Sequence, residues 1–358
     1  MRVARKGLRL ESALALLWLP SHSLSELAHC PLYLTSAASS ASAVATATVR
    51  GDPPDRLFRS TSEEERSPAM ARRIVCLTFD FDAVSGWIAR GLTSPTPMSR
   101  GEFGLVGARR ILALLKKHGI RSTWFIPGHT IESFPVHAAE VVAAGHEVGH
   151  HGWTHVPPAN MPRDEEEAGL VRGIAAIKRL AGKAPRGYRS PSWDLSPHTI
   201  DLLVGHGFVY DGSMMGDDYR PYSARRGDVV ELEKPLVLGA PTKLIEMPIS
   251  WHLDDYPHFE FLRTPSAILP GLMNARGVLQ NWSDEFRYMT EDVEDWGVLT
   301  YTFHPFVIGR GHRMLILEEL IKDLLGMGAV FLSMEEAANE WRARQSGPDA
   351  GDRRVSLT

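Results

Sequence analysis

The chain has 358 residues, of which 44% are hydrophobic and 23% are charged, a composition typical of soluble globular proteins. Its formal net charge of −4 and its lack of a long basic run exclude the usual signature of a nucleic-acid-binding protein. Only two cysteines, Cys30 and Cys76, are present, which excludes a disulfide framework. The sequence contains no run of about 18 apolar residues, so we expect no membrane-spanning helix.

The N-terminal residues differ in composition from the rest of the chain. A low-complexity tract occupies 36–43 and shows neither helical nor strand periodicity. A basic start precedes a short apolar run at 13–19, which leaves targeting or secretion open as an alternative to a cytoplasmic location. We interpret 1–69 as a disordered or mis-assigned extension, 70–345 as one folded domain and 346–358 as a flexible tail.

From Arg72 onward, short β-rich runs alternate with segments that have apolar residues at helical spacing. The predicted elements, in chain order, are a strand at 73–79, a helix at 103–118, a strand at 120–126, a helix at 135–144, a strand at 147–149, a helix at 163–180, a strand at 187–190, a helix at 197–204, strands at 208–210, 244–248 and 298–303, a helix at 314–325 and a strand at 329–332. This alternation predicts a parallel sheet with crossover helices.

Polar residues fall at or just after the ends of the predicted strands, namely Asp80, Asp82, His151, Arg189, Asp211 and His304. Catalytic groups of barrel enzymes occupy the C-terminal ends of the strands, and no glycine-rich dinucleotide motif follows the first strand. We therefore predict an α/β fold, a distorted (β/α) barrel. The long stretch 214–290 is expected to cover the site through its aromatic residues Trp251, Tyr256, Phe259 and Phe261.

Thr78-Phe79-Asp80-Phe81-Asp82 ends the first predicted strand. Because side chains alternate along a strand, both carboxylates lie on one face and repel each other. One interpretation is a simple turn, because aspartate is common where strands end. The other is a cation site, because a nearby cation would relieve the repulsion between the two carboxylates.

His151-Gly-Trp-Thr-His155 places two imidazoles four residues apart, so that a single turn of backbone lets both face one point. His146 and His150 lie close by, which leaves the identity of the ligands open. Combined with the two aspartates, the histidines supply two nitrogen ligands, one oxygen ligand and one spare carboxylate. Three protein ligands with an open position are typical of a hydrolytic metal site, in which the spare carboxylate acts as the base.

These two motifs, followed by Arg189-Ser-Pro-Ser-Trp193 and by 299–305 with its histidine, resemble the polysaccharide deacetylase family with its NodB homology domain, or carbohydrate esterase family 4. The resemblance covers roughly 74–341 and implies a seven-stranded barrel. The Asp-x-Asp form of the first motif and the segment 250–256 resemble the branch of peptidoglycan-deacetylase-like proteins, cyclic imidases and allantoinases.

The resemblance also implies a role for each matching residue. Asp80 would be the general base, His304 would be the general acid, and Arg189 would keep Asp80 ionised. The metal ligands would be Asp82, His151 and His155. The substrate-binding residues would be Trp193, Trp251 and Asp255. Arginine beside a carboxylate lowers the carboxyl pKa, and histidine protonates a leaving amine near neutral pH. Zinc is the expected metal, and the mixed nitrogen and oxygen ligands also accept cobalt, nickel or manganese.

The resulting prediction is a metal-dependent hydrolase of a non-peptide carbon–nitrogen bond that deacetylates an N-acetylated sugar or glycan. Hydrolysis of a small cyclic imide or ureide is the first alternative, and a catalytically inactive barrel that only binds a glycan or metal is the second. The expected partners are a small molecule or a glycan, without nucleic acid or membrane, and relatives in this branch suggest a homo-oligomer. The sequence leaves open whether Asp254 or Asp255 orients His304.

Overall fold

The computed structural model describes residues 71–263 and 268–346. The predicted extension at 1–69 lies outside these residues, as does all of the predicted tail beyond Ser346, so both interpretations stay predictions. Within the described part of the chain, no helix is both long enough and apolar enough to cross a membrane.

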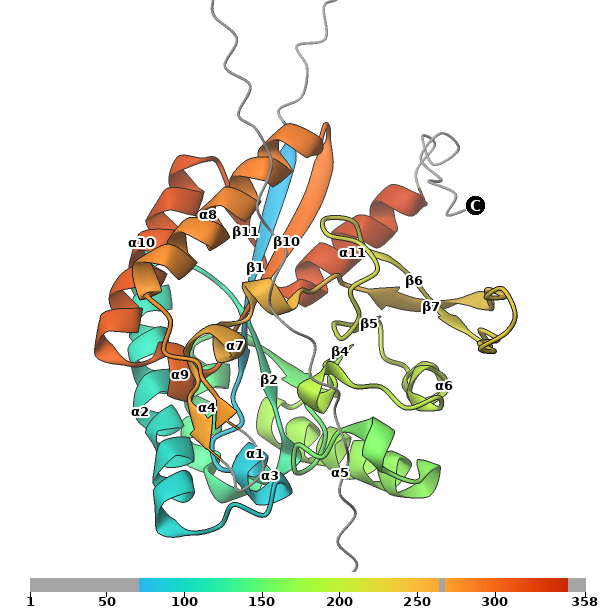
Figure 1. Cartoon of the computed structure of the whole chain (residues 1–358), viewed down its shortest axis with the longest axis horizontal. Coiled ribbons are helices and arrows are strands. Elements are labelled where there is room, and N and C mark those ends of the chain that lie inside the picture. The colour runs from blue at the N-terminus through green and yellow to red at the C-terminus, as the bar shows by residue number, and fades with distance from the viewer. Residues whose placement is uncertain (1–70, 264–267, 347–358) are drawn as a thin grey trace, which may run out of the picture. The chain divides into compact units, whose positions relative to one another are not determined.

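The centre of the domain is a sheet in which nine strands of the described residues take part (Figure 1). Its strands are β1 (Arg72–Asp80), β2 (Thr123–Ile126), β3 (Glu147–His150), β4 (Gly187–Tyr188), β5 (Tyr210–Asp211), β6 (Tyr222–Arg226), β7 (Ala240–Glu246), β10 (Trp296–Phe303) and β11 (Val330–Phe331). The order is β10-β1-β2-β3-β4-β5-β7-β6, with β11 also paired to β1, and every pairing except β6 with β7 is parallel.

This sheet confirms the predicted distorted (β/α) barrel, although it has nine strands where the resemblance implied seven. Beside β10, irregular segments rather than a regular strand pair with the edge of the sheet. The Val298 amide donates to the Tyr219 carbonyl oxygen at 2.9 Å, and Asp254 forms an isolated parallel bridge with Thr302. These irregular contacts distort the barrel and bring the segment around Asp254 beside the end of β10.

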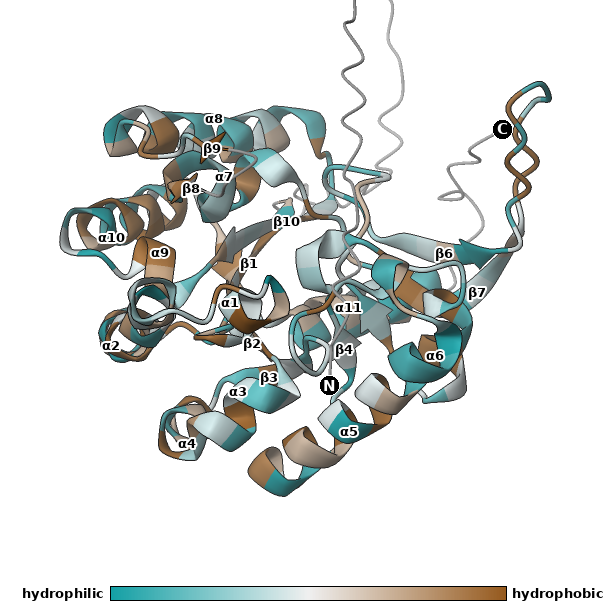
Figure 2. Cartoon of the chain, turned by 60° about the horizontal axis from the view of Figure 1, so that its bottom comes forward, coloured by the Kyte–Doolittle hydropathy of each residue, from teal (hydrophilic) through white to brown (hydrophobic). Residues whose placement is uncertain are grey.

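Helices pack around the sheet with their apolar residues facing inward (Figure 2). The longer ones are α2 (Pro95–His118), α4 (Pro135–Ala143), α5 (Arg163–Ala181), α6 (Thr199–Gly205), α8 (Ala275–Asp292), α10 (Gly311–Gly326) and α11 (Met334–Gln345). The shorter elements are α1 (Ser85–Ala89), α3 (Gly128–Ser133), α7 (Asp255–Phe259), α9 (Pro305–Ile308), the 3₁₀ turns η1 (Pro158–Asn160), η2 (Pro191–Trp193) and η3 (Trp251–Leu253), and the ribbon β8 (Leu262–Arg263) with β9 (Ile268–Leu269). Seven consecutive residues of β1 are buried, as expected for a strand covered on both faces.

Every element predicted between 73 and 332 has a counterpart with shifted ends, but two long helices were missed. The expected covering stretch 214–290 contains regular structure, namely β6, β7, α7 and most of α8. In α8, Val278, Trp282 and Phe286 recur at a spacing of four and are buried in the core, so these apolar residues belong to an amphipathic helix rather than a lid. The second missed helix, α11, follows the last strand.

Candidate active site

The candidate site lies where β1, β3, β4 and β10 end, close to α1 and α7. Asp80 is the last residue of β1 and Asp82 follows it, while His151, Arg189 and His304 each come directly after β3, β4 and β10. The carboxyl ends of parallel strands lie on one edge of the sheet, so residues far apart in sequence come together there. The structure brings these side chains together at this edge, as the sequence predicted.

Asp82, His151 and His155 form a compact, buried trio (here called the ligand trio). His151 Nε2 lies 3.4 Å from Asp82 Oδ1, His155 Nε2 lies 3.5 Å from Asp82 Oδ2, and all three ligand atoms lie within 4.8 Å of one another. The Nδ1 of His151 donates to the carbonyl oxygen of Arg189 at 2.8 Å, which leaves Nε2 with its lone pair toward the carboxylate.

Two atoms of the ligand trio, Asp82 Oδ1 and His151 Nε2, are buried and have no hydrogen-bond partner among the described residues. Buried polar atoms are normally satisfied, so this pair needs an external partner. Two imidazole nitrogens and one carboxylate oxygen are a donor set that binds a divalent transition metal with a position left open. The residues therefore fit a divalent cation, and burial already lowers the pKa of His155 well below its ordinary value, which favours the neutral, ligating form.

The other nearby histidines are excluded as ligands by their surroundings. His150 is fully buried on the opposite face, where its Nε2 donates to the carbonyl oxygen of Leu170 at 3.1 Å. His146 lies against Ser122, 3.1 Å from the hydroxyl oxygen. The structure thus resolves the choice that the sequence left open, because of the four histidines between 146 and 155 only His151 and His155 face the aspartates.

Asp80 is paired with a fully buried arginine. The Nη1 of Arg189 donates to Asp80 Oδ1 at 2.8 Å and to Thr78 Oγ1 at 2.8 Å, while its Nε donates to the Gly212 carbonyl oxygen at 3.1 Å. Burial alone would raise the pKa of Asp80, but the Arg189 charge, helped by His151, holds it below its ordinary value. Asp80 is thus ionised near neutral pH, with its other oxygen, Oδ2, 3.7 Å from His151 Nε2.

His304 is held by Asp255, which answers the second question that the sequence left open. His304 Nδ1 lies 2.8 Å from Asp255 Oδ1, and the His304 amide donates to both Asp255 oxygens at 3.0 Å. Asp254 Oδ1 is more distant from Nδ1, at 3.5 Å, and accepts the Tyr256 amide at the start of α7. Burial would lower the pKa of His304, but these carboxylates raise it to about 10, and its Nε2 lies 4.0 Å from Asp82 Oδ2.

The position of Asp255 favours a role other than the expected contact with the substrate. Asp255 has no exposed surface and does not line the pocket beside the ligand trio. Its position behind His304, forced by the backbone of α7, makes it a support for the imidazole. Asp211 likewise lies away from the pocket, fully buried, where it accepts the hydroxyl of Ser213 at 2.6 Å.

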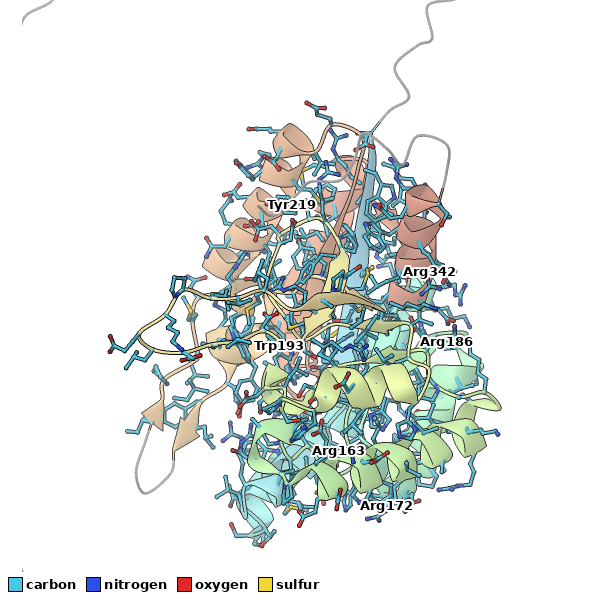
Figure 3. All side chains as sticks on the ribbon, turned by 90° about the vertical axis from the view of Figure 1, so that its right-hand side faces the viewer. Arg163, Arg172, Arg186, Trp193, Tyr219 and Arg342 are labelled. Atoms are coloured by element: carbon cyan, nitrogen blue, oxygen red, sulfur yellow. The ribbon has the colours of Figure 1, made fainter. Side chains whose placement is uncertain are left out.

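A pocket of ~130 Å³ opens beside the ligand trio. It is lined by Asp80, Asp82, Ala83, Gly86, Trp87, Arg90, His155, Ser192, Trp193, Trp251, Asp254, Tyr256, His304 and Phe306. Trp193, labelled in Figure 3, stacks on Trp251 with ring centroids 4.0 Å apart, and Trp251 remains 43% exposed. This stack gives the pocket an aromatic wall.

Two of the four aromatic residues expected to cover the site do not do so. Trp251 and Tyr256 line the pocket, whereas Phe259 is buried in the core against Trp282 and Phe261 lies outside the pocket lining. Phe259 turns inward because it lies on the short helix α7, whose inner face packs on the end of β10.

Sequence reasoning missed the contribution of α1 to the pocket, through Gly86, Trp87 and Arg90. A methyl group added to Gly86 would lie 3.8 Å from His155 Nδ1 and 3.9 Å from Asp82 Oδ2, so α1 packs directly against the ligand trio. A five-residue helix carries too little periodicity to be predicted. The only available signal was its position just after the Asp-x-Asp motif.

Comparisons with known proteins agree with the fold and the motifs. The model of the polysaccharide deacetylase family matches residues 69–210. The chain is 38% identical to a peptidoglycan deacetylase of Helicobacter pylori over 291 residues, which cover 77% of this chain and 98% of that protein. It is 30% identical to a peptidoglycan deacetylase-like protein of Gibberella zeae over 308 residues, 76% of this chain and 88% of that protein.

Solved structures give the same picture. A Mycobacterium smegmatis protein described as a polysaccharide deacetylase superimposes with a TM-score of 0.68 at 31% identity, covering 78% of this chain and 94% of that chain. An allantoinase superimposes with a TM-score of 0.63 at 21% identity, covering 77% and 92% of the two chains, which is a likeness of fold alone.

Proposed function

Because this chain belongs to the polysaccharide deacetylase family, whose members hydrolyse carbon–nitrogen bonds other than peptide bonds, we propose that it removes the acetyl group from an N-acetylated amino sugar of a glycan. The observation that carries the proposal is the buried arrangement of Asp80 and His304, whose nearest atoms lie 3.7 Å and 4.0 Å from atoms of the ligand trio. This arrangement supplies a base, an acid and a cation site around one small pocket.

Asp82, His151 and His155 would hold one divalent cation, for which zinc is our first choice and cobalt, nickel or manganese are alternatives. When bound, the cation supplies Lewis-acid chemistry, since it makes water more acidic and polarises the amide carbonyl. Burial raises the pKa of Asp82 to about 6, and a neighbouring cation favours its ionised form.

Asp80 is proposed as the general base. Its Oδ2 lies on the side of the ligand trio and takes the proton of the attacking water, while Oδ1 stays bound to Arg189. Arg189 has no exposed surface and does not line the pocket, so we assign it a positioning role rather than contact with the substrate. Its buried charge keeps Asp80 ionised and ready to accept the proton.

His304 is proposed as the general acid. The water oxygen forms a bond to the amide carbon, the carbon–nitrogen bond breaks, and His304 Nε2 gives its proton to the departing nitrogen. Asp255 holds Nδ1, which fixes the ring so that Nε2 faces the ligand trio. The products are acetate and a free amino sugar. Loss of a proton from Asp80 to solvent and uptake of a proton from solvent by His304 restore the starting state.

The aromatic wall of Trp193 and Trp251 is suited to a sugar ring, because the apolar face of a pyranose packs on aromatic surfaces. The small pocket itself, ~130 Å³, is of a size to take the acetamido group and not several sugar rings. We infer that the remaining part of a glycan lies outside the pocket along the exposed side of Trp251.

The small size of the pocket also favours a second candidate function, hydrolysis of a small cyclic imide or ureide by the same residues. Such a ring would occupy the pocket entirely and use the same acid and base. The third candidate, an inactive binding barrel, is opposed by the presence of both Asp80 and His304 in positions to transfer protons.

A substrate panel on zinc-loaded protein tests these functions against one another. Acetate release from chitooligosaccharides and peptidoglycan fragments is measured beside ring opening of succinimide-like compounds, with Asp80→Asn as the inactive control. We expect acetate release from a glycan. Ring opening alone would replace the first function by the second, and no turnover of any compound, together with glycan binding, would leave only the binding barrel.

A further inference from the structure

Two buried carboxyl groups that the proposed mechanism does not use lie side by side on neighbouring strands. Asp211 is the last residue of β5 and Glu246 is the last residue of β7, and the two are register partners in this parallel pair (Figure 1). Neither residue has any exposed surface, and neither lines the pocket beside the ligand trio. Any role of this carboxyl pair (Asp211 and Glu246) in the reaction must therefore act through other residues.

Each member of the carboxyl pair has one oxygen with hydrogen-bond donors and one without. Asp211 Oδ1 accepts the Ser213 hydroxyl at 2.6 Å. Glu246 Oε1 accepts the amides of Ser213 and Met214 at 2.9 Å and 2.8 Å. The other two oxygens, Asp211 Oδ2 and Glu246 Oε2, are buried and have no donor among the described residues. Buried polar atoms are normally satisfied, so both oxygens need a donor that the surrounding N–H and O–H groups do not supply.

A proton held between the two carboxyl groups is such a donor. The two side chains are in hydrogen-bonding contact, and two buried carboxylates in contact would repel each other unless one of them is protonated. Burial, together with the charge of Asp211, raises the pKa of Glu246 well above its ordinary value. Within the described part of the chain, no third histidine, cysteine, aspartate or glutamate joins the pair in a cluster suited to a metal ion.

Ser213 connects the carboxyl pair to the candidate active site. Its hydroxyl donates to Asp211 Oδ1 and accepts the amide of Ser190 at 2.9 Å. Ser190 directly precedes the turn η2, and its carbonyl oxygen accepts the Trp193 amide at 2.9 Å. The turn that carries one ring of the aromatic wall is thus bonded to the carboxyl pair through one hydroxyl group.

The segment 211–214 also holds Arg189, the positioning partner of Asp80. The carbonyl oxygen of Gly212 accepts Arg189 Nε at 3.1 Å. A methyl group added at Gly212 would lie 2.9 Å from Met334 Cε and 3.7 Å from Arg189 Nη2, so the backbone packs closely against the guanidinium. A displacement of 211–214 would therefore move Arg189 as well as the turn η2.

We propose that Asp211 and Glu246 share one proton, and that the pair so formed fixes the segment 211–214 and thereby positions the motif from Arg189 to Trp193. The inference rests on the proposed function, because it adds two positioning residues to the same site. Neither carboxyl group touches the substrate. Loss of the shared proton would leave two like charges in contact and release the segment.

Amide variants test the shared proton, because an amide has the shape and the donor of a protonated carboxyl group. In Glu246→Gln the new N–H₂ group donates to Asp211 Oδ2, and in Asp211→Asn it donates to Glu246 Oε2. Each single variant should keep nearly the urea midpoint of the unaltered, metal-free protein near neutral pH. The double variant opposes two N–H₂ groups, so its midpoint should fall by clearly more than the sum of the single shifts, and failure of the double variant alone to fold would be the extreme form of this result. Additive shifts, or a large loss in either single variant, would overturn the shared proton.

Ser213→Ala tests the connection to the site, because it removes the hydroxyl between Asp211 and Ser190 and leaves the carboxyl pair in place. For zinc-loaded, folded protein we expect kcat for acetate release from a glycan to fall by about 10- to 100-fold, as small misplacements at an active site do. The stacked rings of Trp193 and Trp251 should give a circular dichroism couplet, which should weaken in this variant. A loss of stability alone would change neither quantity in the folded protein.

Ser283→Ala is the matched control, because Ser283 is another buried serine and its hydroxyl has no partner among the described residues. It should leave kcat and the couplet unchanged, and Trp251→Phe supplies the spectrum without the couplet. An unaltered couplet or an unaltered kcat in Ser213→Ala would overturn the positioning role.

Failure of the proposed function remains distinguishable from failure of this inference. If the unaltered protein releases acetate from no glycan, the deacetylase function fails. The urea midpoints of the amide variants and the couplet in Ser213→Ala need no substrate, so they still decide whether the proton is shared and whether it holds the turn.

Discussion

Replacement of Arg189 by methionine tests the buried ion pair that keeps Asp80 ionised. Both side chains are almost completely buried, with Nη1 2.8 Å from Asp80 Oδ1. Breaking a buried pair by removing one partner costs about 3–5 kcal/mol, because the remaining charge is left without compensation. If that cost acts on the ionised form alone, it corresponds to a rise of roughly 2–4 units in the pKa of Asp80.

The sign of the pH dependence follows from the direction of this shift. In the unaltered protein the pKa of Asp80 lies below its ordinary value of 3.8, so the pair stabilises the fold above that pH and the stabilisation is lost only as the pH falls through the lower, folded-state pKa. In Arg189→Met the unpaired carboxyl has a raised pKa. Its destabilisation is therefore largest at alkaline pH and shrinks as the pH falls and the carboxyl becomes protonated.

The assay is urea unfolding of metal-free protein between about pH 5 and 9, with a chelator present so that a cation does not contribute its own charge. Arg179→Met is the matched control, because Arg179 pairs with Glu132 at the surface, where such pairs contribute about 0–1 kcal/mol. We expect a loss of about 3–5 kcal/mol for Arg189→Met at the alkaline end and less at the acid end. A deficit that does not vary with pH, or that equals the control, would refute the reasoning.

Three further predictions concern the acid, the aromatic wall and the N-terminal segment. The carboxylates beside His304 raise its pKa to about 10, so Asp255→Asn should move the alkaline limb of the pH–kcat/KM profile to lower pH, and an unmoved limb would mean that Asp255 does not act on the acid. Trp251→Ala should raise the KM for a chitooligosaccharide by about 2- to 10-fold, as loss of one aromatic contact does, and an unaltered KM would place the glycan elsewhere. A truncated chain that begins at Met70 should match the full chain in thermal midpoint and activity, and an insoluble or inactive product would show that 1–69 is needed.

The general position of the site could be predicted because it depends on strand ends. Asp80 and Asp82 follow an apolar run and His151 follows another, and a parallel sheet brings such ends to one edge. The distinction between His150 and His151 needed the backbone, since adjacent residues on a strand point to opposite faces and either register fits the sequence. The same reason explains why the roles of Asp254 and Asp255 could not be separated.

Other parts of the site depend on tertiary packing that leaves no periodic signal. Arg90 caps a five-residue helix that is too short for a hydrophobic pattern to reveal. A methyl group added at Gly86 of this helix would lie 3.3 Å from Arg90 Nη1 and 3.8 Å from His155 Nδ1. Phe259 was expected at the pocket because aromatic residues in a long connection resemble a cover. Its burial beside Trp282 is a consequence of how α7 and α8 pack, which residue type alone does not specify.

The measurement that tests the central claim most directly compares metal content and turnover in a set of matched variants. Asp82→Ala and His155→Ala each remove a ligand atom of the trio, whereas Asp80→Asn removes the proposed base and leaves the trio intact. We predict strongly reduced metal content in the first two, and retained metal with a loss in kcat of about 10²-fold or more in Asp80→Asn, as expected when general-base catalysis is removed. Unchanged metal content in both ligand variants, or near-normal turnover of Asp80→Asn, would contradict the account.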